Sequence, residues 1–199
     1  MFSKNVRPIF ITGANKGIGF ALVKRLLEER EDVFVFLGSR DVLRGQEAVS
    51  KLCALNPSYE GRLQCVSCDV ASDASVNSAA KEIEAQLKQV KSPLFGLVNN
   101  AGIGSSPKGH KEVFNVNLYG PKRVFETIYP LLEPKEGRVL LVSSAAGPNF
   151  VAKQEDTTQA MLTNRDVEFE EIEGFIHTFL NASDDNETHS GLALSLIHI

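Results

Sequence analysis

The sequence predicts a doubly wound α/β fold built on a parallel sheet. Segments with strand character alternate along the chain with segments of helical spacing, which is the pattern of successive β–α–β units. The run Val33-Phe34-Val35-Phe36-Leu37 is wholly apolar, as expected for a strand covered by helices on both faces. A glycine-rich turn, residues 12–19, joins the first strand segment directly to the first helical one. The other elements are organised around this turn.

Five strands are expected. Each is a short, largely apolar or β-branched run that leads into polar or small residues typical of a turn. The expected strands are 9–12, 33–37, 63–68, 94–98 and 138–143.

The first two helices are predicted from spacing. Behind the glycine turn, Ile18, Leu22 and Leu26 lie four apart and therefore share one helix face. A second helix is expected over 41–55, with Leu52 and Leu55 on its inner side.

Three further helices follow. Ser72 and Asp73 open a helix with helical spacing of Val76, Ala80, Ile83, Leu87 and Val90. The segment 111–132 is helical but contains Pro121, which predicts a kink or local irregularity. Residues 149–165 show no clear period. Segment 166–182 reads as an acidic amphipathic helix with Ile172, Phe175, Ile176 and Phe179 facing inward.

Composition is that of one soluble globular domain: 199 residues, 43% hydrophobic and 23% charged. A net charge of −4 gives no reason to expect nucleic acid or an anionic membrane as a partner. The N-terminal residues lack the apolar core of a secretory signal, and no run approaches the length of a membrane span. A cytoplasmic location is therefore the expectation.

Three cysteines do not form a disulfide framework. Cys65 and Cys68 form a C-x-x-C, which invites a redox or metal interpretation. Within a strand, an offset of three places the two side chains on opposite faces. We therefore interpret them as small apolar residues of a buried strand and expect no metal site.

The stretch Thr-Gly-Ala-Asn-Lys-Gly-Ile-Gly resembles the cofactor loop of the short-chain dehydrogenase/reductase family, and its Asn-Lys is most similar to the carbonyl reductases. In such a loop the first glycine turns the chain, the second admits a ligand to the backbone amides, and the third packs the helix on the strand. Helix N-termini favour phosphate, and a lysine adds charge. The cofactor residues implied here are Gly13, Asn15, Lys16, Gly17, Ile18 and Gly19.

The residues after the second and third strands extend this site. Gly38-Ser39-Arg40 lacks the acid that would hold a ribose 2′-hydroxyl, and Arg40 suits a 2′-phosphate, which favours NADP(H). The alternative is a solvated arginine at a helix start. By resemblance, Asp69 and Val70 hold the adenine, Asp69 accepting from its exocyclic amine. Asp69 as a simple turn cap is the alternative.

After the fourth strand comes Asn99-Asn100-Ala101-Gly102, the most specific match beyond the loop. The resemblance implies that Asn100 steadies the sheet and the cofactor ribose, and that Ala101 and Gly102 line the cofactor. A generic turn is the alternative, made less plausible by the first loop at the right distance upstream.

Two catalytic residues are implied by the resemblance. Asn117 matches the helix asparagine that holds a water of the proton relay, and Ser144 matches the serine that hydrogen-bonds the substrate carbonyl, with Ser143 the runner-up. The family's Tyr-x-x-x-Lys is absent from the sequence. Tyr119 with Arg123 has a similar spacing but belongs to the asparagine helix, so we reject it.

The domain prediction is a single dinucleotide-binding reductase domain over 1–193, of Rossmann type and incomplete in its C-terminal strands. About 149–190 resembles a helical insertion of carbonyl-reductase-like members. Residues 194–199 resemble a translated library adaptor and are interpreted as a non-native tail. In strand order 3-2-1-4-5-6, ending after the fifth strand leaves an unprotected apolar edge, so we expect aggregation or poor folding.

The resemblance therefore implies NADPH-dependent reduction of a ketone, aldehyde or quinone by hydride transfer, with this chain nearly inactive because it lacks the general acid. The alternative is a non-catalytic dinucleotide-binding short form that acts as a sensor or partner protein. The expected partner is a small-molecule carbonyl substrate, without nucleic acid or membrane. The family insertion makes a monomer the expectation.

Overall fold

The protein is described by a computed structural model that covers residues 6–104 and 106–182. Its elements in chain order are β1 (Arg7–Ile11), α1 (Gly17–Glu29), β2 (Val33–Ser39), α2 (Val42–Leu55), the 3₁₀ helix η1 (Pro57–Tyr59), β3 (Leu63–Ser67), α3 (Asp73–Val90), β4 (Gly96–Asn99), α4 (His110–Phe114), the π-helix η2 (Asn115–Tyr119), α5 (Gly120–Ile128), the 3₁₀ helix η3 (Tyr129–Leu131), β5 (Arg138–Leu141), α6 (Ala146–Val151), α7 (Asp156–Thr163) and α8 (Phe169–Ala182).

The five strands form one parallel sheet in the order β3-β2-β1-β4-β5. This is the expected order of the first five strands, so the predicted doubly wound α/β class is confirmed. Among the described helices, none combines the length and the apolar character that crossing a membrane requires.

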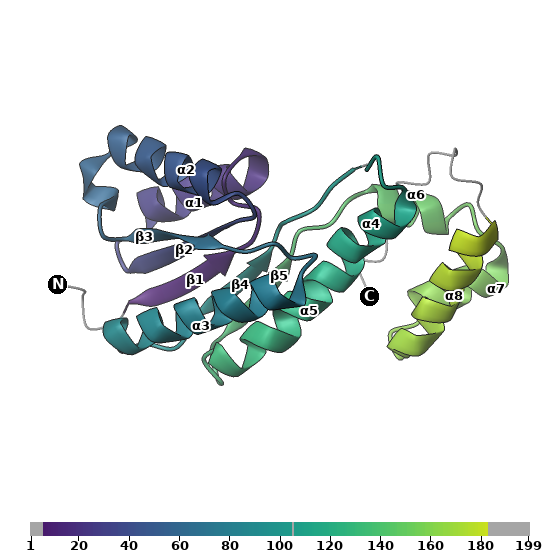
Figure 1. Cartoon of the computed structure of the whole chain (residues 1–199). Coiled ribbons are helices and arrows are strands. Elements are labelled where there is room, and N and C mark those ends of the chain that lie inside the picture. Colours follow the sequence, from purple (N-terminus) through teal and green to yellow (C-terminus); the bar gives the residue numbers. More distant parts are fainter. Residues whose placement is uncertain (1–5, 105, 183–199) are drawn as a thin grey trace. The chain divides into compact units, whose positions relative to one another are not determined.

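Helices cover both faces of this sheet. In Figure 1, α1 and α2 lie on one face, and α3 and α5 lie on the other. Side chains alternate along each strand, so Ile9 and Ile11 of β1 pack toward α1 and α2 while Phe10 points to the opposite layer. All three are buried, which explains the unbroken apolar runs.

One expectation about a helix face needs correction. Leu55 is 62% exposed, not inward, because α2 ends at this residue and the chain turns away into η1; Leu52 is fully buried as predicted. On α1 the buried residues are Gly19, Val23 and Leu27, and Ile18 is 70% exposed.

The described residues divide into two compact units. The first comprises the chain up to Ala101 together with Gly120–Val142 and contains the whole sheet; the second comprises Gly102–Tyr119 and the chain from Ser143 on. The expectation that residues 1–193 form a single domain stays a prediction. Residues 194–199 lie outside the described part of the chain.

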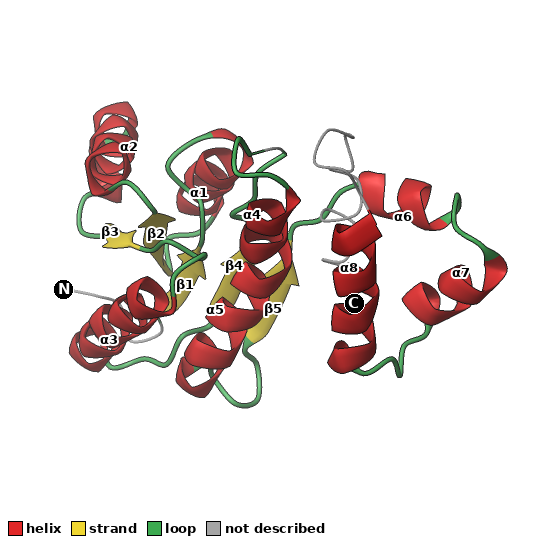
Figure 2. Cartoon of the chain, turned by 45° about the vertical axis from the view of Figure 1, so that its right-hand side comes forward, coloured by secondary structure: helices red, strands yellow, loops and turns green. Residues whose placement is uncertain are grey.

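The second unit has a core of its own. Its fully buried members are Val113, Phe114, Leu118, Leu162, Ile172 and Ile176. Helix α8 corresponds to the amphipathic segment predicted over 166–182. Two further helices, α6 and α7, precede α8 in the chain (Figure 2). These two helices were not predicted, because each is too short to display a period of its own.

The irregularity predicted around Pro121 is present as the π-helix η2, which ends two residues before the proline. Proline has no N–H, so the carbonyl of Asn117, four residues earlier, lacks its normal α-helical donor. π-Helical turns of this kind accommodate such a disruption and are frequent at functional sites. The proline therefore explains why the helix changes its winding here.

Within the described residues, β5 pairs with β4 alone, so its other edge is open. Its side chains Val139, Leu140 and Leu141 are 41%, 52% and 44% exposed. An exposed apolar edge strand is a template for pairing with another chain.

We expect the purified chain to self-associate as its concentration rises, and Leu140→Lys to suppress this by placing a charge on the edge. Leu43→Lys is the matched control, because Leu43 is an exposed leucine on α2, away from any strand edge. Sedimentation velocity measures the change. A chain that stays monomeric at every concentration tested would contradict the expectation.

Candidate cofactor and catalytic site

The turn after β1 leaves the N-terminus of α1 without a protein cap. Gly13 and Gly17 have positive φ angles of 63° and 57°, which only glycine adopts without strain. Lys16 stands at the N-cap position with no side-chain cap bond, and the first turn carries no acid. In the described part of the chain, the N–H groups of Gly17 and Ile18 find no acceptor.

The neighbouring helices differ in this respect. Asp41 caps α2 by accepting from the Arg44 N–H at 3.1 Å, and Ser72 caps α3 by accepting from the Ser75 N–H at 3.3 Å. Helix N-termini carry about half a positive charge. Among these three helices, α1 is the one whose first turn has no side-chain cap and whose N-cap position holds an exposed lysine. This arrangement suits a phosphate group.

Gly19 packs α1 tightly on the end of β1. A Cβ atom there would lie 2.5 Å from Asn100 Nδ2, 2.7 Å from the Gly13 oxygen and 2.8 Å from Ala14 Cα. Two of these neighbours are backbone, which cannot move aside. The expected packing role of the third glycine is thus visible in the structure.

Thr12 ties the turn after β4 to the end of β1. Its Oγ1 accepts hydrogen bonds from the backbone N–H groups of Asn100 and Ala101, both at 3.0 Å. The Asn100 side chain donates to the carbonyl oxygens of Thr12 at 2.9 Å and Gly13 at 3.1 Å. Asn100 therefore joins two strand ends. Sequence reasoning missed Thr12; the only signal was a polar residue closing an apolar strand.

The ends of β2 and β3 lie together. The Cys68 N–H donates to the Ser39 oxygen at 2.9 Å, which places the Arg40 and Asp69 segments side by side. Arg40 is exposed and makes no ion pair with the described residues. Asp69 uses one carboxylate oxygen to accept from the Ala71 N–H at 3.1 Å, as the turn-cap alternative predicted. Its other oxygen has no donor among the described residues.

Asn117 and Gly102 belong to the second unit. Asn117 is fully buried, and its side-chain amide forms two hydrogen bonds with the backbone of Ile103. Its Oδ1 accepts from the Ile103 N–H at 2.9 Å, and its Nδ2 donates to the Ile103 carbonyl oxygen at 2.8 Å. A Cβ on Gly102 would lie 3.3 Å from Asn117 Oδ1. The side-chain amide is thus committed to the loop after β4.

Ser144 also lies in the second unit, just beyond β5. Its Oγ accepts from the Ala146 N–H at 3.2 Å, which leaves the hydroxyl proton available for donation. The hydroxyl of Ser143, the runner-up, is buried and without a hydrogen-bond partner in the described residues. This burial favours Ser144 as the serine that can reach a substrate.

Tyr119 and Arg123, which we rejected as a catalytic pair, make different contacts. Burial raises the pKa of Tyr119 above its ordinary value, and the nearby Glu173 raises it further. Its ring packs edge-on against Phe169. Arg123 instead contacts Val70 and Asp73.

The cysteines lie on an edge strand and beyond its end. Cys65 in β3 is half-buried rather than buried, because within the described residues β3 pairs with β2 alone. Cys68 is 3% exposed and follows the strand. Burial, with a smaller contribution from Asp69, raises the pKa of Cys68 to about 12.

A thiol with this pKa is about 1 part in 10⁴ thiolate at pH 8, so Cys68 is expected to resist iodoacetamide in the folded chain and to react once denaturant is added. Mass spectrometry after a short pulse of reagent distinguishes Cys68 from the less buried Cys53. Equal labelling of the two in the folded chain would argue against this account.

Comparisons with known proteins show which family this chain resembles. The family model described as short chain dehydrogenase matches residues 7–155. The mitochondrial D-beta-hydroxybutyrate dehydrogenase of Bos taurus is 35% identical over 148 residues, 71% of this chain and 42% of that protein. Carbonyl reductase [NADPH] 1 of Sus scrofa is 31% identical over 187 residues, 89% of this chain and 61% of that protein.

Among solved structures, a menthone neomenthol reductase from Mentha piperita has the same fold. It aligns with a TM-score of 0.77 at 24% identity and covers 96% of this chain and 81% of that one. The chain thus spans about half the length of the curated relatives it matches. Since the family model covers most of the sheet and every strand end described above, the chain belongs to the short-chain dehydrogenase/reductase family of oxidoreductases.

Proposed function

We propose that this chain binds NADP(H) and belongs to the carbonyl reductase branch of its family. The observation that carries the proposal is the uncapped N-terminus of α1, where free amide donors, positive-φ glycines and the exposed Lys16 meet at the carboxyl end of the central strand. Ligands of doubly wound sheets bind at this end of the strands. The diphosphate would lie on these amides, with Asn15 and Ile18 beside it.

Two further features support a complete dinucleotide. Asn100 and Ala101, held by Thr12, would face the nicotinamide-side ribose, and Gly102 would let the cofactor pass close to the backbone. Ile18 is a large apolar side chain that is 70% exposed beside the turn, which suits contact with a planar ring. At the other end, Asp69 and Val70 would hold the adenine.

Arg40 supports NADP(H) over NAD(H). The segment after β2 offers no acid to a ribose 2′-hydroxyl, since the nearby Asp41 caps α2. An unpaired arginine there can form charge-assisted hydrogen bonds to a 2′-phosphate. The relative from Sus scrofa carries NADPH in its name, in agreement with this choice.

We expect Arg40→Ala to weaken NADPH binding by roughly 10- to 150-fold while NADH binding stays unchanged, because only the charge-assisted contacts to the 2′-phosphate are lost. Arg44→Ala is the matched control, since Arg44 is an exposed arginine one helical turn further, paired with Asp41. Fluorescence titration gives both dissociation constants. If Arg40→Ala weakened NADPH and NADH equally, Arg40 would not select the phosphate.

For catalysis, the Ser144 hydroxyl would donate to a substrate carbonyl and stabilise the charge that develops on its oxygen. The reduced nicotinamide, when bound, supplies the hydride. Because the Asn117 amide is engaged with Ile103, the group of Asn117 able to hold a relay water is its main-chain carbonyl, which Pro121 deprives of an α-helical donor.

The printed sequence contains no Tyr-x-x-x-Lys, so the general acid of the family is lacking. General acid catalysis contributes typically 10²–10⁴-fold, and the 199-residue chain is expected to reduce quinones or ketones slower than a complete reductase by about that factor. The same observation favours a second candidate: a non-catalytic dinucleotide-binding form. NADPH oxidation at rates like those of a complete reductase would exclude both the expected slow turnover and the non-catalytic form. A small-molecule carbonyl as substrate and a cytoplasmic location stay predictions. So does the monomer that the family insertion implies, which concerns helix-mediated oligomers and not pairing at the open edge of β5.

A further inference from the structure

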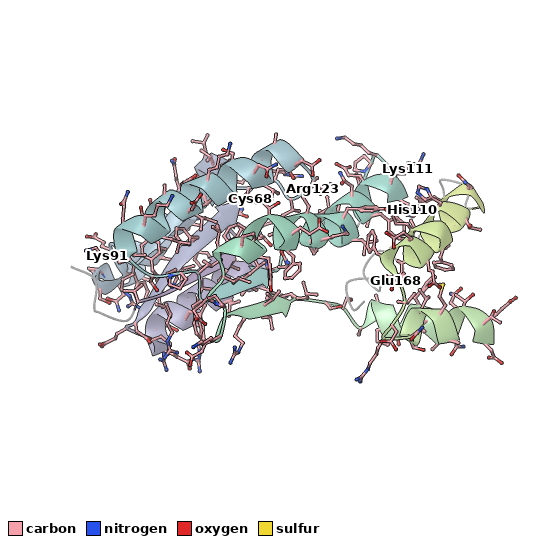
Figure 3. All side chains as sticks on the ribbon, turned by 90° about the horizontal axis from the view of Figure 1, so that it is seen from below. Cys68, Lys91, His110, Lys111, Arg123 and Glu168 are labelled. Atoms are coloured by element: carbon pink, nitrogen blue, oxygen red, sulfur yellow. The ribbon has the colours of Figure 1, made fainter. Side chains whose placement is uncertain are left out.

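Arg123 reaches from α5 to the turn after β3. Figure 3 labels it on α5, which packs beside α3. Its Nη1 donates to the Val70 carbonyl oxygen at 2.6 Å, and its Nε donates to the Asp73 carboxylate. The Arg123 side chain is 18% exposed, whereas that of Asp73 is 80% exposed. One contact is therefore sheltered and the other lies in solvent.

The sheltered contact, from Arg123 to the Val70 carbonyl, involves the peptide group between Val70 and Ala71. The carbonyl of Val70 accepts from Arg123, and the N–H of the same peptide unit, that of Ala71, donates to Asp69 Oδ1 at 3.1 Å. A guanidinium on the carbonyl fixes the plane of this peptide and polarises its N–H toward the carboxylate. The orientation of the Asp69 carboxylate is thereby linked to a side chain 54 residues away in the sequence.

The rest of the turn is anchored locally. The Asp69 N–H donates to Ser75 Oγ at 2.9 Å, and the Ser72 N–H donates to the backbone carbonyl oxygen of Asp69 at 3.1 Å. The Val70 side chain is 5% exposed. Arg123 thus adds to this turn a contact from an element that is distant in the sequence.

Two groups of this turn have no partner within the described residues: the second carboxylate oxygen of Asp69 and the N–H of Val70. They form an acceptor and a donor on adjacent residues. Adenine presents the complementary pair, an amino donor on C6 and an acceptor at N1. Hypoxanthine presents the reverse, with an oxygen on C6 and an N–H at N1.

We propose that Arg123 is a positioning residue for recognition of the adenine 6-amino group, acting through the Val70–Ala71 peptide on Asp69. The inference rests on the proposed function, because it requires that a dinucleotide binds at this end of the sheet. The ion pair with Asp73 is not the cause, since exposed pairs contribute little.

The test compares NADPH with its reduced hypoxanthine analogue by fluorescence titration of the full 199-residue chain. The wild-type chain is expected to prefer NADPH by on the order of tenfold or more. Arg123→Met, which keeps the length of the side chain but removes its donors, should reduce this preference to within about twofold, chiefly by weakening NADPH binding. Asp73→Asn is the matched control and should retain the full preference.

A purely structural role would weaken both dinucleotides equally and leave the preference intact, which would overturn the inference. Arg123→Lys retains one donor for the Val70 carbonyl and should recover part of the preference; no recovery would count against the hydrogen bond as the cause.

Hydrogen exchange on the dinucleotide-free chain gives a readout should Arg123→Met bind too weakly to titrate. Exchange at the Ala71 amide should accelerate in Arg123→Met and not in Asp73→Asn, while the α3 core amides stay protected. Unchanged exchange at Ala71 would refute the positioning role. If the wild-type chain bound no dinucleotide, the proposed function would fail and this inference with it; preserved discrimination in Arg123→Met would remove this inference alone.

Discussion

Replacing Gly19 by valine is expected to lower the free energy of unfolding by about 3 kcal/mol and to abolish dinucleotide binding. The added Cβ would lie 2.7 Å from the Gly13 oxygen and 2.8 Å from Ala14 Cα, so α1 must move away from the end of β1. The amide donors at the start of α1 would move with it. Urea unfolding and titration with NADPH measure the two effects.

Gly104→Val is the control for this substitution. No atom lies within 4 Å of a Cβ built on Gly104, and its φ is not in the left-handed region, so its cost should stay within about 0.5 kcal/mol. Equal stability of Gly19→Val and the wild-type chain would mean that α1 is not packed on β1 as described.

Replacing Thr12 by valine should lower the free energy of unfolding by about 2–4 kcal/mol. Valine has nearly the shape of threonine but cannot accept hydrogen bonds, so the partly buried N–H groups of Asn100 and Ala101 lose their partner. Each unsatisfied buried donor costs about 1–3 kcal/mol. The turn that would line the cofactor should loosen as a result.

Thr12→Ser separates this effect from packing. Serine keeps the hydroxyl and removes one methyl group, which costs about 0.8 kcal/mol. The prediction is therefore a large loss for valine and a small one for serine, measured by urea unfolding. The reverse order would show that the Thr12 methyl group, not its hydroxyl, stabilises the strand ends.

Local features of the fold could be predicted from sequence where one residue acts on its neighbours. Ser72 caps α3 where the sequence predicted that this helix begins, and Pro121 predicted the irregularity seen as η2. Strand order followed from alternation and from the rules of doubly wound sheets. The exposure of Leu55 was not predictable from helical spacing, because it depends on where the chain turns after α2.

The candidate site likewise contains residues that could be predicted from the sequence and residues that could not. Its glycine turn is visible in the sequence because φ and close packing restrict those positions to glycine. Thr12 and Arg123 were missed as structural residues because their partners lie 50 to 89 residues away, and no local pattern reports such contacts. Asn117 was predicted as a site residue. The two hydrogen bonds between its side-chain amide and the backbone of Ile103 could be recognised only in the structure.

The most direct test of the central claim is a titration of NADPH into the folded chain and into Lys16→Ala, with Lys24→Ala as control. Lys16 is exposed beside the free amides of α1, whereas Lys24 lies further along the same helix and pairs with Glu28. We predict saturable binding that Lys16→Ala weakens on the order of tenfold and Lys24→Ala leaves unchanged. A cooperatively folded chain that binds neither reduced nor oxidised nicotinamide dinucleotides would contradict the account.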